Sequence, residues 1–276
     1  MNSVEVWEWE QIAPIIDTYI GMVKAELRER VKAWSLDLAQ YEMHEAVGAL
    51  LARQVTLAVQ LAAAPPIWNP HLAPLILRSM IDTYISLGWI LCNPVDRAQK
   101  FILYGLGQEK LEIEHLKARA EAENRKPEDD PIIKSKEGWL NEQRYEFLTE
   151  VNVGRWSGVD TRKMAEEAGL LDVYRYDYQP SSGATHSQWH HVGKYNLVTC
   201  PNPLHKFHKI PIAPELGSDI AYLQRAAEYV EKTFALFDNK FSVKIIAPSS
   251  LVALSASFNA VSQIEDDEEA VVIVEQ

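Results

Sequence analysis

Apolar residues recur at helical spacing along most of this chain. Two long amphipathic segments, 4–34 and 36–64, open the sequence, and the second ends at a pair of prolines. The same spacing returns in 218–237, and a further helix is expected near 249–262. Glycine is scarce, and the sequence contains no internal repeat. The pattern therefore predicts an all-α fold, a single multi-helix bundle.

Three dipeptides mark expected helix starts, because in each an Asn or Asp can cap the helix while proline occupies its first turn. They are Asn69-Pro70, Asn93-Pro94 and Asp130-Pro131. Helices are therefore predicted to begin near residues 70, 94 and 131. The helix from residue 94 becomes highly charged, which suggests that it extends past the core. Further helices are expected at 134–153 and at 161–168, the latter stopped by Gly169.

The helical rhythm is interrupted by prolines and short polar residues between Tyr174 and Pro214. A long irregular insertion near residues 174–214 is therefore expected, with at most a short helix around His186. An acidic run, EDDEE, follows near the end of the sequence. We divide the chain into one helical domain, 1–264, and an acidic, flexible tail, 265–276.

The composition, with 47% hydrophobic and 24% charged residues, is that of a globular protein with a sizeable core. Two cysteines cannot form a disulfide framework, and the N-terminal segment lacks a secretory pattern, so a cytoplasmic location is expected. The apolar stretch 72–92 approaches the length of a membrane span, but Arg78 and Asp82 near its middle make spanning costly. It is interpreted as a buried helix, with no membrane partner.

Arg78 and Asp82 are the first candidate site residues. They lie four residues apart in an apolar stretch, and a charge buried there must be paired. One interpretation is an intrahelical salt bridge that also holds a neighbouring loop. The other is an anion-binding or catalytic pair that lines a cleft, since burial beside a charge is typical of active sites.

The stretch SSGATHSQWHHV, residues 181–192, is the second candidate. Its Ser, Thr, His and Trp residues favour a polar pocket wall. His186 and His190 have i, i+4 spacing, which zinc could use if Cys200, His205 or His208 completed the ligand shell. A serine nucleophile with a histidine base is a further alternative. The HExxH, CxxC and GxSxG patterns are absent, so we expect no metal and no cofactor.

Alternating tyrosines, Tyr174, Tyr176 and Tyr178, precede that stretch. They can stack on bases or sugars, or cover the core with their hydroxyls in water. Trp156 and Arg162 add aromatic and basic character nearby. The net charge of −12 argues against a broad electrostatic hold on nucleic acid but leaves room for a local basic groove.

Two segments, LILRSMIDTYISLGWIL followed by NPVDRAQKFILYG, and YRYDYQPSSGATHS, resemble an uncharacterised bacterial all-helical family of unknown function. The resemblance spans about Leu72 to Ser187. It implies an Arg and an acidic residue four apart on a buried helix, then a late Tyr…Ser-x3-His segment. The matching positions are Arg78, Asp82, Tyr178, Ser182 and His186, with Asp82 where the family more often has Glu.

The family is in turn loosely similar to HEPN-type proteins, many of which are metal-independent ribonucleases of toxin and phage-defence systems. HEPN nucleases carry Arg and His on one helix with four to six residues between them, a spacing absent from this sequence. If the protein cuts RNA, its Arg and His must therefore converge from distant segments. The leading hypothesis is a phosphodiester-cleaving effector in which His186 acts as general acid or base, Arg78 stabilises negative charge and Asp82 orients Arg78. Tyr178, Ser182 and His190 are the expected binding residues, for RNA or another phosphate-containing ligand.

The alternative is a non-enzymatic interaction module, such as an adaptor, immunity protein or sensor. A protein partner would then bind the long charged helix or the acidic tail. Helices that are apolar on all faces also favour a homo-oligomer.

Overall fold

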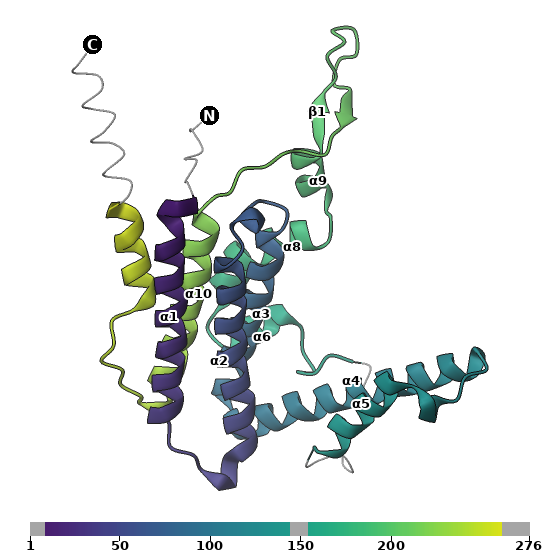
Figure 1. Cartoon of the computed structure of the whole chain (residues 1–276), viewed down its shortest axis with the longest axis vertical. Helices are drawn as coiled ribbons and strands as arrows, with labels where there is room; N and C mark the ends of the chain where they lie inside the picture. The colour runs from purple at the N-terminus through teal and green to yellow at the C-terminus, as the bar shows by residue number, and fades with distance from the viewer. Residues whose placement is uncertain (1–8, 144–153, 261–276) are drawn as a thin grey trace.

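The structure is a computed structural model that describes residues 9–143 and 154–260. Four long helices lie side by side in its bundle (Figure 1): α1 (Trp9–Ala33), α2 (Tyr41–Ala62), α3 (Ala73–Cys92) and α10 (Ala221–Phe241). Short 3-10 turns, η1 (Leu38–Gln40) and η2 (Pro65–Ile67), flank α2. The last described residues form a helix, Ser250–Ala260, that lies beside α1. The all-α class is confirmed.

Helix α3 lies at the centre of the molecule. It packs against α2 and α10 and also against α6 (Thr161–Glu167) and α8 (Gln179–Thr185). Of the described helices, α3 is long and apolar enough to cross a membrane, yet 67% of that apolar window is buried inside the protein. Such burial is what the central helix of a globular core shows.

Two of the three proline dipeptides directly precede a helix, as expected at residues 94 and 131, whereas Asn69-Pro70 lies in a turn before the helix that begins at residue 73. The Asp130 carboxylate accepts hydrogen bonds from the N–H groups of Ile132 and Ile133, at 2.9 and 3.4 Å, and caps α5 (Pro131–Asn141). The Asn69 carboxamide caps a turn that precedes α3, which begins at residue 73. Asn93 is followed directly by helix α4, but its side chain makes no capping hydrogen bond.

Helix α4 (Pro94–Ala122) leaves the bundle and folds back through η3 (Pro127–Asp129) into α5, and together they form a projecting arm (Figure 1). The arm has an apolar cluster of its own, formed by Leu106, Ile113, Ala120, Ile133 and Leu140. The predicted extension of α4 past the core is therefore confirmed. The helix predicted at 134–153 begins at residue 131 and ends at Asn141, and residues 144–153 lie outside the described part.

The segment 174–214 is more regular than the sequence indicates. After α6 come a short helix, α7 (Leu171–Val173), a π-helical turn, η5 (Tyr174–Tyr178), then α8 and α9 (Trp189–Tyr195). Pro180 does not interrupt this path because it lies in the first turn of α8, where a missing N–H costs nothing. The irregular part begins after α9.

A small hairpin follows α9 and projects from the bundle (Figure 1). Its strands, β1 (Leu197–Thr199) and β2 (Lys209–Pro211), pair antiparallel, with Val198 opposite Ile210. An extended connection then leads to α10. The predicted acidic tail, 265–276, lies outside the described residues, so the proposed domain division stays a prediction.

Candidate functional site

Four of the six predicted site residues meet at one place between α3 and the η5–α8 segment. The Arg78 side chain is only 11% exposed, and its guanidinium forms an ion pair with Asp82. Its Nε–H donates a hydrogen bond to Ser182 Oγ at 3.1 Å, and its central carbon lies 3.2 Å from the centre of the Tyr178 ring. The Ser182 hydroxyl donates in turn to the Tyr178 carbonyl at 2.9 Å. We call these four residues the Arg78 cluster.

The local sequence explains how the cluster forms. Arg78 and Asp82 are one helical turn apart on α3, and Tyr178 and Ser182 are one turn apart across the start of α8. Each pair therefore presents both side chains on one side of its own helix. Partial burial raises the pKa of the Asp82 carboxyl above its ordinary value, while the Arg78 guanidinium opposes that shift.

The two predicted histidines lie outside the Arg78 cluster. His186 follows the end of α8, is exposed, and its side chain makes no hydrogen bond, ion pair or ring contact with any described residue. His190 is the second residue of α9, and its ring lies so close to α8 that a Cβ at Gly183 would fall 2.1 Å from its Nε2. The structure thus places the His190 ring against Gly183, the residue that follows Ser182, and leaves His186 in solvent.

A second histidine group lies at the base of α9. His191 Nε2 and His71 Nδ1 are 3.2 Å apart, and the Tyr195 ring contacts both imidazoles. Burial lowers the pKa of His191, and the nearby His71, His190 and Lys194 lower it further. The group fixes α9 against the turn before α3.

A cavity of about 410 Å³ opens beside the Arg78 cluster and shares Tyr178 with it. Tyr178 and Tyr174 stack in its wall with ring centres 4.9 Å apart, and the Tyr178 hydroxyl donates to Thr161 Oγ1 at 3.2 Å. The remaining lining residues are Tyr104, Gly154, Arg155, Trp156, Ser157, Val159, Asp160, Arg162 and Met164. We call this space the Tyr178 cavity.

The wall of the Tyr178 cavity depends on contacts that the sequence did not indicate. Trp156 packs edge-on against Trp89 and Phe101, and the Tyr104 hydroxyl donates to the Gly154 carbonyl at 2.9 Å. The contributing segments are far apart in sequence, so periodicity within one helix carries no signal for their meeting. The sequence signal that did exist was the aromatic and basic character of Trp156 and Arg162.

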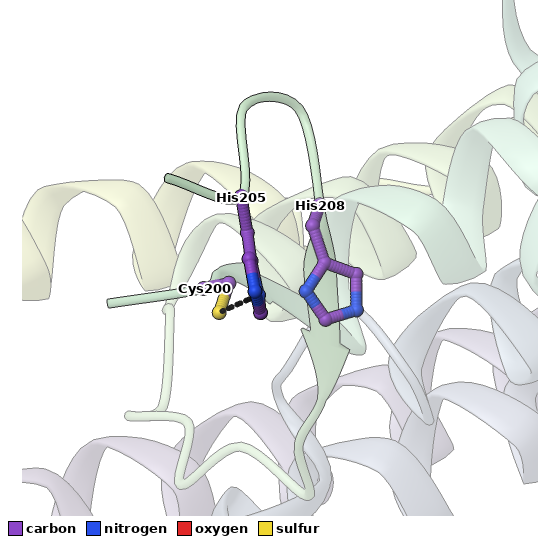
Figure 2. Close-up of side chains that lie close together, drawn as sticks. All are labelled: Cys200, His205 and His208. Carbon is purple, nitrogen blue, oxygen red and sulfur yellow. Dashed lines mark hydrogen bonds between the residues drawn. The ribbon is translucent and has the colours of Figure 1, made fainter. Parts of the chain in front are cut away.

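The residues best placed to hold a metal lie elsewhere, on the hairpin. Cys200, His205 and His208 offer one ligand atom each, and these atoms all lie within 4.8 Å of one another (Figure 2). The zinc alternative from the sequence started from His186 and His190, and this compact group contains neither.

Residues 44–202, more than half of the chain, match the model of a family described as a family of unknown function, DUF5677. The chain belongs to DUF5677. The expected resemblance to an uncharacterised helical family is thereby confirmed, with wider bounds than Leu72 to Ser187. No curated protein and no solved structure gave a match. The DUF5677 segment contains the Arg78 cluster, His186 and His190, and it ends before His205 and His208.

Proposed function

We propose that this DUF5677 protein is a cytoplasmic effector that binds RNA, or another phosphate-containing ligand, in the Tyr178 cavity. One observation carries the proposal: stacked Tyr174 and Tyr178 share the cavity wall with Arg162. Aromatic faces stack on bases of any sequence, and a guanidinium fits phosphate oxygens. The further proposal that this effector belongs to a toxin or phage-defence system rests on the loose similarity of the family to HEPN-type proteins.

The size and charge of the cavity suit a single nucleotide unit. A volume of about 410 Å³ lies in the range of small-ligand sites. Arg162 is exposed and forms no ion pair with any residue that the structure describes. Arg155 lies 4.0 Å from Asp160 in an exposed pair, so its charge is only loosely compensated.

In this proposal Arg78 is a positioning residue rather than a catalytic one. Its guanidinium is engaged by Asp82, Ser182 and the Tyr178 ring, and so holds the ring that forms the cavity wall. Cleavage would require a general acid or base. His186, which follows α8 and does not line the Tyr178 cavity, stays the candidate that the sequence indicates for this role.

Binding is tested by fluorescence anisotropy with a labelled single-stranded RNA. Tyr174→Ala should weaken binding by about 1–3 kcal/mol, roughly 5- to 150-fold. Tyr176 is 70% exposed and does not line the cavity, so Tyr176→Ala should change binding little. Arg162→Gln should reduce the slope of log binding constant against log salt concentration by about one. Lys163→Gln is its matched control and should leave this slope unchanged, because Lys163 already pairs with Glu166. Equal affinities for the cavity variants and their controls would refute the proposed site.

Cleavage is tested separately, by incubating the RNA with wild-type protein and with His186→Ala and separating the products on a gel. The expected result is cleavage by the wild type and none by the variant, with RNA binding retained in both. Full cleavage by His186→Ala would remove His186 from the mechanism while leaving the binding proposal intact.

The arm formed by α4 and α5 supports a second candidate function, self-association. Ile133 and Leu140 of α5 are buried against α4, while Ile132 and Trp139 are 58% and 49% exposed. These two exposed residues are seven positions apart, or about two helical turns, so they lie on one outward face of the helix. An apolar face of this kind fits a second copy of the chain, as expected for a homo-oligomer.

Light scattering after size-exclusion chromatography tests this second candidate. We expect a dimer for the wild type and a monomer for the double variant Ile132→Glu, Trp139→Glu. Val252→Glu replaces another exposed apolar residue, on the helix at the far end of the chain, and should leave the dimer unchanged. A monomeric wild type would contradict this use of the arm.

A further inference from the structure

The hairpin brings Cys200 and His208 next to each other. Strand register pairs Thr199 with Lys209, so Cys200 and His208 are the next facing pair, and the Cys200 N–H donates to the His208 carbonyl at 3.0 Å. Facing residues of antiparallel strands have Cβ atoms about 4.5–5.5 Å apart. One thiol and one imidazole are therefore neighbours because of the backbone alone.

Local hydrogen bonds fold the loop so that His205 joins this pair. The His205 N–H donates to the Asn202 carbonyl at 3.0 Å, and the His208 N–H donates to the His205 carbonyl at 3.1 Å. The Asn202 side chain accepts from the Leu204 N–H at 3.0 Å and so fixes the first of these turns. The loop thereby returns the His205 ring to Cys200, as Figure 2 shows.

The distances match those of a zinc site. A tetrahedral zinc ion with Zn–S of about 2.3 Å and Zn–N of about 2.1 Å separates its sulfur and nitrogen ligands by about 3.6 Å. Cys200 Sγ and His205 Nδ1 are 3.6 Å apart. All three ligand atoms lie within 4.8 Å of one another, so small rotations of exposed side chains bring His208 to the same separation.

We propose that Cys200, His205 and His208 bind one Zn²⁺ ion at the end of the hairpin. A thiolate and two imidazoles form a ligand set that binds zinc in preference to magnesium or calcium, because those harder ions favour oxygen ligands. Three protein ligands leave the fourth position to water or to a group of a bound molecule. The site does not depend on the proposed RNA binding, because none of its residues lines the Tyr178 cavity.

Asn202 offers a way to tune the site. Its side-chain Nδ2 lies 3.2 Å from His205 Nε2. When His205 binds metal through Nδ1, Nε2 carries the proton, and an oxygen is then the better neighbour. Asn202→Asp supplies a second carboxylate oxygen there while the first still accepts from Leu204. We therefore expect Asn202→Asp to tighten zinc binding several-fold.

Cobalt titration of the full, tag-free, reduced and chelator-treated chain tests the proposal. We expect a thiolate-to-cobalt charge-transfer band and visible bands of tetrahedral Co²⁺ that saturate at one equivalent and disappear when Zn²⁺ is added. Cys200→Ser should abolish the charge-transfer band and weaken zinc binding by more than about 100-fold, since even outer-shell partners contribute roughly 10–100-fold. His205→Gln and His208→Gln should each weaken binding similarly.

Two matched controls separate this site from adventitious binding. Cys92→Ser changes the other cysteine, which is exposed at the end of α3, and His115→Gln changes an exposed histidine of the arm. Both should retain one equivalent of cobalt with the thiolate band. Cobalt binding without that band in the wild type, or an unchanged Cys200→Ser, would overturn the proposal. Far-UV circular dichroism should show the same helix content in every variant, because the hairpin projects from the bundle (Figure 1).

Discussion

Replacement of Arg78 by Met tests whether the Arg78 cluster holds the η5–α8 segment on α3. Met keeps most of the apolar stem of the side chain and removes the guanidinium. The variant loses the hydrogen bond to Ser182, the contact over the Tyr178 ring and the ion pair with Asp82. It also leaves a carboxylate beside the core without its cation.

The loss of stability follows from these contacts. A hydrogen bond from a charged group contributes about 1.5–3 kcal/mol, and a cation over an aromatic ring about 0.5–2 kcal/mol. The Asp82 side chain is 46% exposed, so solvent screening limits the ion pair to about 0–1 kcal/mol. Because such terms are not additive, we expect a total of about 2–4 kcal/mol. With an unfolding entropy of roughly 0.6 kcal/mol/K for a chain of this length, the melting temperature should fall by about 3–7 °C.

Differential scanning calorimetry with a matched control decides the outcome. Arg175→Met removes an exposed arginine of η5 whose distance to Asp172 is 3.7 Å, and it should lower the melting temperature by less than about 1 °C. A melting temperature for Arg78→Met within 1 °C of the wild type would refute the argument that Arg78 holds this segment.

Three further predictions concern buried polar groups and a close contact. Burial raises the pKa of Glu26, so Glu26→Gln should leave stability unchanged below about pH 4 and increase it progressively as the pH rises toward 7. Tyr19→Phe removes a buried hydroxyl that has no hydrogen-bond partner among the described residues, and it should stabilise the protein by about 1 kcal/mol in urea unfolding. Gly183→Ala should destabilise by about 1–3 kcal/mol, since its Cβ would overlap the His190 ring, and the loss should vanish in a His190→Ala background.

The sign of the Glu26 effect follows from linkage. The native carboxyl holds its proton more tightly than the unfolded one, so its contribution to stability is complete below the ordinary pKa and is lost as the pH rises through the raised value. Gln removes this loss and can still meet Ser250, which donates to both Glu26 oxygens. A stability difference that does not change with pH would contradict the assigned burial of charge.

The other two predictions have internal controls. Tyr229→Phe should destabilise where Tyr19→Phe stabilises, because the Tyr229 hydroxyl donates to Asp177 at 2.7 Å. Equal effects of the two variants would show that the hydroxyl of Tyr19 is satisfied. For Gly183, an undiminished loss in the His190→Ala background would place its cause elsewhere on α8.

The sequence predicted what local periodicity can carry. The apolar stripe of α10, with Leu223, Val230 and Phe237, is buried as expected, and Gly169 takes the left-handed conformation that ends α6. It did not predict the π-helical turn at 174–178 or the regular path through Pro180, because tyrosine-rich and serine-rich stretches have no apolar period. The hairpin was not predicted either, because each of its strands is only three residues long, too short for an alternating pattern to be recognised.

The sequence could not predict which members of the candidate site meet, because that depends on where helix α8 ends. Ser182 and His186 have i, i+4 spacing, which would place both on one face of a continuing helix. Helix α8 ends at Thr185, and the next positions, His186 and the left-handed Ser187, change the direction of the chain. Ser182 therefore contacts Arg78, whereas His186 extends into solvent. Sequence spacing cannot locate such an end to within one residue.

The two sequence interpretations of Arg78, a structural salt bridge or a functional pair, are not alternatives in this fold. The face of the Tyr178 ring contacts the guanidinium, while its hydroxyl contacts Thr161 in the cavity wall. An arginine that stabilises the α3–α8 contact thus also sets the position of the ring against which Tyr174, the residue proposed to stack on RNA, is packed. Arg78→Lys separates the two contributions, because lysine keeps the charge beside Asp82 but loses the planar stacking over the ring. We expect RNA binding to fall more in Arg78→Lys than in Arg175→Lys at temperatures where all variants are folded, and equal affinities would confine Arg78 to stability.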